Sequence, residues 1–175
     1  MQSAHKPAGF TLVELIITMA VISVAVLGIT YALSFAFSHQ SDGIWQAKSV
    51  ALAESYLEEI MSRRYDETTP SGGVPPCSLA TTACSSALGS EGETRDSFDD
   101  VDDFDGVDDQ PPLDADGLPR SEYSSFRVEV SVAYVSAAQV ASLGLDNPRD
   151  AKLVTVTVTP PGSSPLRFPM LRGNF

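Results

Sequence analysis

The sequence predicts an α+β fold in which a long N-terminal helix packs on a small antiparallel sheet. The range 10–64 contains no proline and only two glycines, which favours one extended helix. Two later segments, 126–134 and 152–159, alternate apolar and polar side chains, which is the pattern of half-buried strands. We therefore expect a helical first third of the chain and a sheet built from its C-terminal part.

The N-terminal half of the predicted helix is apolar enough to lie in a membrane. The run 10–37 carries a single charged residue, Glu14. As a helix it would extend about 42 Å, whereas the hydrocarbon core of a bilayer is about 30 Å thick. A cleaved secretory signal has a shorter apolar core followed by a small-residue site, so we expect this segment to be retained. Lys6 in the polar leader 1–9 predicts a cytoplasmic N-terminus, with the remaining chain across the membrane.

The helix should continue as an amphipathic half over residues 38–65. Its predicted packing face follows the i, i+3, i+4, i+7 pattern and comprises Ala53, Tyr56, Leu57, Ile60 and Met61. Arg63 and Arg64 suit the negative C-terminal end of a helix dipole, and Pro70 follows as a stop signal. The Ser-Asp-Gly sequence at 41–43 predicts a bend or an interruption near the membrane surface.

Three strands complete the predicted fold. In the first, 126–134, the inward side chains would be Phe126, Val128, Val130, Val132 and Tyr134. In the second, 152–159, they would be Val154, Val156 and Val158, which alternate with threonines. A weaker strand over 166–171 contains Pro169, which confines it to the edge of the sheet.

The two cysteines, Cys77 and Cys84, lie in the globular region 66–175, which we place outside the cytoplasm. A short-range pair in that compartment predicts a disulfide. Two thiolates without clustered histidines would not complete a zinc shell, which makes a metal site the weaker alternative.

The acidic segment 91–116 carries twelve acids and one base, so it accounts for −11 of the net charge of −12. This distribution argues against a nucleic-acid partner, which requires a basic face. Within the segment, four apolar residues recur at every third position and should act as anchors for the acids between them: Phe98, Val101, Phe104 and Val107.

Calcium is one interpretation of the acids in this segment, because Ca²⁺ takes six to eight oxygen ligands. The candidate ligands are Asp99, Asp100, Asp102, Asp103, Asp105, Asp108 and Asp109. Their spacing does not follow the EF-hand template, so any calcium site would be irregular. A solvated acidic loop and an acidic docking face for a basic partner remain as alternatives. No other cofactor is expected.

The sequence G-F-T-L-V-E at residues 9–14, after a short basic leader and before a long apolar helix, resembles the class III signal of type IV pilins and pseudopilins. The resemblance implies that a prepilin peptidase cuts after Gly9 and that the new Phe10 amine is N-methylated. It also implies that Glu14 pairs with the N-terminal amine of a neighbouring subunit during assembly. The implied partners are other pilins, the peptidase and an inner-membrane assembly platform.

Physical chemistry supports this role for Glu14. A carboxylate within a bilayer costs roughly 2.5–3.5 kcal/mol on insertion scales, and a positive chain terminus on an adjacent helix would offset much of that cost. The alternative is a plain signal anchor with a stray acid near the interface. The chain has no proline between Pro7 and Pro70, so the helix should be more continuous than in many major pilins, which favours a minor subunit.

A finer resemblance covers most of the chain. The helix sequence at 51–60, the G-G-V-P-P-C sequence at 72–77 and the acidic segment ending Q-P-P at 110–112 are similar to minor prepilins of the MshD type, from the mannose-sensitive haemagglutinin (MSHA) pilus of proteobacteria. This implies an inner-membrane protein that later enters a pilus. The alternatives are a minor pseudopilin of a type II secretion system and a membrane-anchored module that binds calcium or glycans. No catalytic motif is found, so an enzyme is not expected.

Overall fold

The computed structural model describes residues 9–70, 72–77 and 83–174, with the side chains of 38–42 left out. Helix α1 spans Leu12–Met61, so it crosses the range 41–43 without the interruption that the sequence predicted there. It ends four residues before the predicted limit of 65. The chain forms two compact units that meet within α1, one up to Ile44 and one from Trp45 on.

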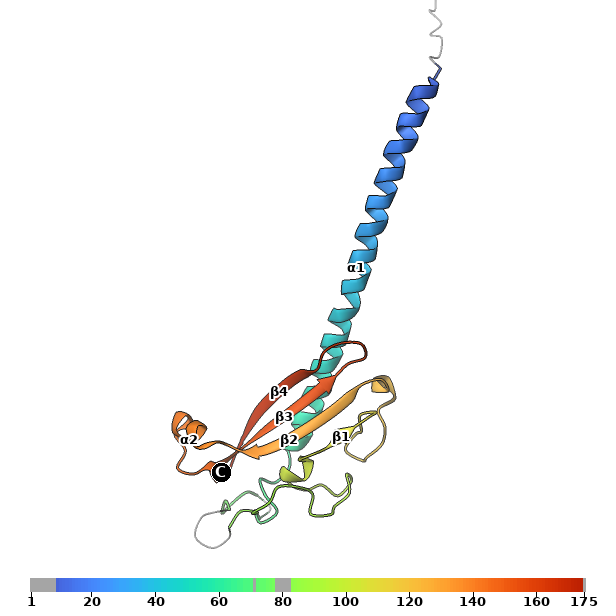
Figure 1. Cartoon of the computed structure of the whole chain (residues 1–175). Coiled ribbons are helices and arrows are strands. Elements are labelled where there is room, and N and C mark those ends of the chain that lie inside the picture. The colour runs from blue at the N-terminus through green and yellow to red at the C-terminus, as the bar shows by residue number, and fades with distance from the viewer. Residues whose placement is uncertain (1–8, 71, 78–82, 175) are drawn as a thin grey trace, which may run out of the picture. The chain divides into compact units, whose positions relative to one another are not determined.

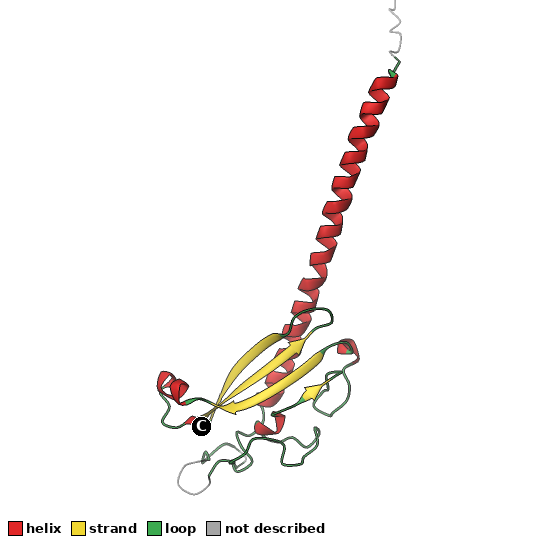
Figure 2. Ribbon diagram, viewed as in Figure 1, coloured by secondary structure: helices red, strands yellow, loops and turns green. Residues whose placement is uncertain are grey.

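The second unit contains a four-stranded antiparallel sheet in the order β1-β2-β3-β4 (Figures 1 and 2). Its strands are β1 (Asp108–Asp109), β2 (Arg127–Tyr134), β3 (Ala151–Thr159) and β4 (Leu166–Gly173). Short 3₁₀ turns occur at Asp102–Phe104, Ser121–Tyr123 and Pro148–Asp150. The predicted α+β architecture, with a long helix and a small antiparallel sheet, is therefore confirmed.

The register of the sheet explains why the alternating segments became strands. Side chains that are paired across β2 and β3 point to the same face of the sheet. The pairs Val128–Val158, Val130–Val156 and Val132–Val154 are buried on one face. Pro169 lies in β4, opposite Thr155 of β3, and β4 is an edge strand as predicted. A proline has no N–H to donate, so it is compatible with this edge position.

The C-terminal part of α1 lies across the buried face of the sheet (Figure 1). Four of the five predicted helix contacts are buried, namely Ala53, Tyr56, Leu57 and Ile60, whereas Met61 is half-buried. Trp45 adds an edge-to-face contact with Phe126, with ring centroids 5.6 Å apart. Each fully buried aliphatic side chain contributes roughly 1.5–3 kcal/mol.

Two elements were not predicted from the sequence. Strand β1 is only two residues long, which is too short for a recognisable alternation. Helix α2 (Ala137–Leu143) is defined by a capping box between Ser136 and Gln139 and by the left-handed Gly144 at its end. None of the residues of α2 is buried, so no apolar stripe marks it in the sequence.

Candidate functional site

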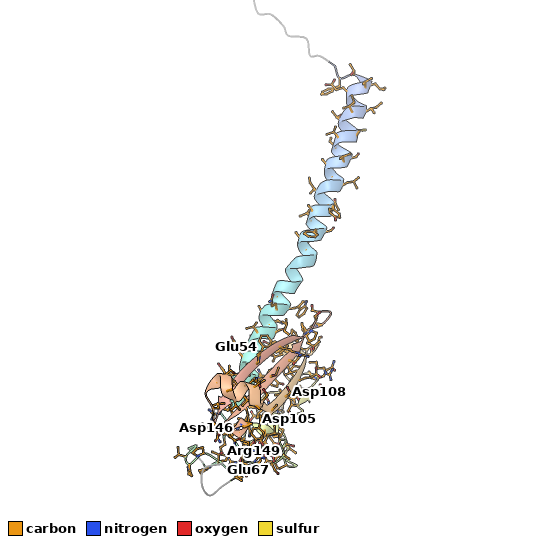
Figure 3. The ribbon with its side chains drawn as sticks, turned by 60° about the vertical axis from the view of Figure 1, so that its left-hand side comes forward. Glu54, Glu67, Asp105, Asp108, Asp146 and Arg149 are labelled. Atoms are coloured by element: carbon orange, nitrogen blue, oxygen red, sulfur yellow. A yellow bond between two sulfur atoms is a disulfide. The ribbon has the colours of Figure 1, made fainter. Side chains whose placement is uncertain are left out.

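The apolar half of α1 exposes its side chains to the surroundings. The stretch Leu12–Phe37 is long and apolar enough to cross a membrane, by length and composition. Figure 3 shows side chains projecting outward along this part of the helix. Large apolar residues such as Phe10, Leu12 and Val13 are more than 60% exposed. An apolar surface of this size requires contact with lipid or with other helices.

Glu14 lies in the first turn of α1, where Thr11 caps the helix. The backbone N–H of Glu14 donates to Thr11 Oγ1 at 3.2 Å, and the pattern Thr-x-x-Glu is one half of a capping box. An acid at this position is favoured by the positive end of the helix dipole. The Glu14 carboxylate is exposed and forms no ion pair with any described residue.

Other polar groups in the same segment are satisfied within the helix. The hydroxyls of Thr18, Ser23 and Thr30 donate to the carbonyls of residues three or four positions earlier, at 2.7–2.9 Å. These bonds allow hydroxyls to enter lipid at low cost. Glu14 differs from them, because its charge has no partner in the described chain.

Gly9 is exposed, and a Cβ atom built on it would meet no atom within 4 Å. The leader residues 1–8 lie outside the described residues, so cleavage after Gly9 and methylation of Phe10 remain predictions.

The acidic segment is packed into the domain. Phe98, Val101 and Phe104 are buried in the main core and Val107 packs against it, so the predicted apolar anchors are confirmed. Backbone bonds tie this segment to the end of α1, because Arg64 N–H donates to the Asp99 carbonyl and its own carbonyl accepts from Val101 N–H.

All seven predicted calcium ligands accept hydrogen bonds or ion pairs from the protein itself. The partners are Arg64 for Asp99, the backbone N–H groups of residues 102 and 103 for Asp100, Lys152 for Asp102, the N–H groups of residues 99 and 100 for Asp103, the Val132 N–H for Asp105, Arg127 for Asp108 and the Tyr56 hydroxyl for Asp109. Asp100, Asp102 and Asp103 are buried. These three side chains do not face outward, because turns and an ion pair hold them inside the domain.

The centre of this arrangement is Lys152, a buried lysine that the sequence analysis missed. Its Nζ donates to Asp102 Oδ1 and to the Tyr65 carbonyl, and it lies 3.5 Å from Asp66 Oδ2. Its ammonium also lies 4.5 Å from the centre of the Tyr65 ring. A signal was present, since Lys152 has the same parity in β3 as Val154 and therefore faces the core.

Burial raises the pKa of the Asp100 carboxyl from its ordinary value to about 7, and the neighbouring Asp102 carboxylate adds to this effect. One oxygen of each group, Asp100 Oδ2 and Asp102 Oδ2, is buried without a hydrogen-bond partner. Two carboxylates in one buried site favour retention of a proton. Lys152 opposes the rise in pKa for both groups.

The predicted disulfide is confirmed. Cys77 and Cys84 are bonded, with Cα atoms 4.8 Å apart, and both are buried beside Tyr65. Asn174 Nδ2 donates to the Cys77 carbonyl at 3.0 Å, which ties the disulfide loop to the C-terminal end of the sheet.

Calcium binding stays a prediction. Two acidic sets have oxygens within 4.8 Å of one another, Glu67 with Asp99 and Asp100, and Glu93 with Asp99 and Asp103. Both sets share Asp99, which already pairs with Arg64. Acidic clusters of this kind occur on many proteins without an ion.

Comparison with known families identifies the N-terminal segment. Residues 5–30 match the prokaryotic N-terminal methylation motif. The match includes Gly9, Phe10 and Glu14, and it supports a type IV prepilin-like protein, a structural class rather than an enzymatic one. The motif implies processing by a prepilin peptidase and assembly with other pilins. Neither a curated protein nor a solved structure matches the chain.

Proposed function

We propose that this chain is a minor subunit of a type IV pilus of the MSHA type, which contributes to priming, to the tip or to assembly of the filament. The observation that carries the proposal is Glu14, an acid in the first turn of an exposed apolar helix that bears the methylation motif, with no ion-pair partner among the described residues. The helix α1 and the small sheet supply the pilin-like architecture. The MSHA assignment rests on the resemblance of residues 51–60, 72–77 and 91–112.

The mechanism follows from the cost of the Glu14 charge. In lipid, the carboxylate is expensive until a cation approaches it. Cleavage after Gly9 would create a positive amine on Phe10, and the amine of an adjacent subunit would neutralise Glu14. Because that partner occupies one position along the helix, the pair would fix the register between subunits, while packing of apolar side chains would supply contact area.

The topology belongs to the same proposal. The N-terminus would lie in the cytoplasm before processing, α1 would cross the inner membrane once, and the domain from Trp45 on would be periplasmic until the subunit enters the pilus. The disulfide Cys77–Cys84 is compatible with that oxidising compartment.

The test is mass spectrometry of filaments sheared from cells that express the chain with a C-terminal affinity tag. The proposal predicts recovery of a chain that begins at methylated Phe10, together with MSHA pilins. Recovery with pseudopilins would assign the chain to a type II secretion system instead. A chain found only in membranes and still starting at Met1 would refute a filament role and leave an anchored calcium- or glycan-binding module.

A further inference from the structure

A pocket of about 250 Å³ lies where the chain leaves α1, and arginines line it. Arg63 and Arg64 follow the end of the helix, and Arg172 reaches the same pocket from β4. Gly72 and Gly73, both with positive φ, form another part of the wall without side chains. An acidic chain with only eleven basic residues thus places three of them around one small space.

Two of these arginines, Arg63 and Arg172, have no carboxylate to themselves among the described residues. Arg64 pairs with Asp99 and Glu67. Arg63 lies 4.0 Å from Glu59, but Glu59 is already held by two hydrogen bonds from Arg95. Arg63 and Arg95 together carry two positive charges against the one negative charge of Glu59, so a net positive charge remains on the Arg63 side of the pocket.

Arg172 is the second uncompensated arginine. It forms no ion pair within the described part of the chain. Its guanidinium donates to the Arg63 carbonyl over a long distance of 3.4 Å. That contact accounts for one nitrogen of the group and leaves its charge without a counterion in the described part of the chain.

The pocket also contains polar atoms with unused hydrogen-bonding capacity. Arg63 Nε, Arg172 Nε, Thr69 Oγ1 and Asn174 Oδ1 are buried without a hydrogen-bond partner among the described residues. Most buried polar atoms in proteins are hydrogen-bonded, and an unsatisfied one costs about 1–3 kcal/mol. All four atoms belong to residues that line the pocket, so the wall of the pocket is polar as well as basic.

The alternative, that these arginines only stabilise the C-terminal end of α1, does not account for both guanidinium groups. Cations near a helix C-terminus interact favourably with the last carbonyls, which suits the contact from Arg172 to the Arg63 carbonyl. This role requires one guanidinium, whereas the pocket holds two: Arg172 forms no ion pair with a described residue, and Arg63 shares Glu59 with Arg95. The helix dipole also weakens anion binding here, so the two arginines must outweigh it.

We propose that this pocket binds a small oxyanion, a carboxylate or a phosphate group, between the guanidinium groups of Arg63 and Arg172. Planar guanidinium groups match both anions with paired hydrogen bonds. The volume is below the roughly 300–1,000 Å³ of drug-sized sites, so it suits a compact anion or the tip of an acidic side chain. The inference does not depend on the assignment to a pilus.

The test measures the melting temperature of the full chain in detergent micelles with sodium citrate, with inorganic phosphate, or with the peptide acetyl-Glu-Glu-amide. Sodium chloride at matched ionic strength is the reference, because salt alone screens the self-repulsion of this acidic chain. Arg172→Gln and Arg63→Gln remove one side of the site each. Arg167→Gln is the matched control, since Arg167 is an exposed arginine in the same strand as Arg172.

The proposal predicts that a saturating anion raises the melting temperature of the wild type and of Arg167→Gln by at least about 3 °C above the chloride reference. Either pocket variant should bind the anion roughly tenfold more weakly or not at all. A response to phosphate alone assigns a phosphate ligand, and a response to citrate and the peptide assigns a carboxylate. Equal shifts in all four proteins would reflect general salt exclusion and would overturn the proposal.

Discussion

Acidic side chains have opposite environments in the apolar half of α1 and in the domain from Trp45 on. In the apolar half of α1, Glu14 is exposed and has no ion-pair partner among the described residues. In the domain, the aspartates of the acidic segment are bound by Arg64, Lys152, Arg127 and backbone N–H groups. The apolar run 10–37 leaves its one acid unpaired among the described residues, whereas the domain uses many acids of the acidic segment internally.

This contrast distinguishes carboxylates that stabilise the fold of their own chain from carboxylates that bind another subunit. A charge with partners in its own chain contributes to folding, and its removal should change stability. A charge in an apolar surface without such partners is a cost to the free subunit, so it must be explained by a partner in another chain. The predictions below test each side of this contrast.

The largest effect should come from Glu14→Ala. We expect incorporation into sheared filaments to fall by more than tenfold, because the variant cannot neutralise the neighbouring amine, while the amount in the membrane stays equal or rises. Immunoblots of the filament and membrane fractions measure both quantities. Glu54→Ala is the control, since Glu54 is an exposed acid on the same helix. Wild-type incorporation of Glu14→Ala would mean that the acid has no assembly role.

Lys152→Met should give the largest loss of stability. The substitution leaves Asp102 and Asp66 buried near each other without their cation, and breaking a buried ion pair in this way costs about 3–5 kcal/mol. Urea unfolding of the full chain in detergent, followed by the near-ultraviolet signal of the domain, measures it. The double variant Lys152→Met/Asp102→Asn should recover part of the loss. If the double variant is less stable than the single one, the pairing is not what stabilises this site.

The sequence predicted the regular parts of both units because periodicity reports burial. The alternation at 126–134 and 152–159 and the helical stripe around Tyr56 each bury one face, so the pattern and the structure agree. The methylation motif could be found for a similar reason, since its function depends on a fixed local order of residues around Gly9.

The acidic segment could be predicted only in part, because its partners are distant in sequence. The spacing of Phe98, Val101 and Phe104 correctly indicated anchors. The direction of Asp102 depends on Lys152, fifty residues away, and only the folded sheet brings them together. The local pattern of acids therefore could not show that three of the aspartates face inward.

Removal of the disulfide should have a smaller effect than removal of the Lys152 charge. In Cys77→Ser/Cys84→Ser the closed loop of eight residues becomes free in the unfolded state, which lowers the free energy of unfolding by about 2.5 kcal/mol. The same urea experiment measures it, with the reduced wild type as the matched comparison. A change below about 0.5 kcal/mol in both proteins would show that the contact of Asn174 with this loop is sufficient to hold it.

The smallest expected effect is a pH dependence at Asp100. Its pKa rises from an ordinary value of 3.8 to about 7 in the folded protein, chiefly through burial and next through Asp102, while Lys152 acts in the opposite direction. A raised pKa means that the contribution to stability is complete below pH 3.8 and is lost as the pH rises toward 7. Asp100→Asn keeps an oxygen for the N–H groups of residues 102 and 103 but has no proton to lose.

Relative to the wild type, Asp100→Asn should therefore gain stability between pH 5 and pH 7, by about 1–2 kcal/mol, because a full pH unit corresponds to at most about 1.4 kcal/mol. Urea unfolding at several pH values measures the difference, and contributions from other titrating groups cancel between the two proteins. Asp116→Asn is the control, because Asp116 is exposed. If the difference in stability between Asp100→Asn and the wild type were constant across this range, Asp100 would be ionised in the folded protein. Asp100 and Asp102 would then carry two negative charges beside the single positive charge of Lys152.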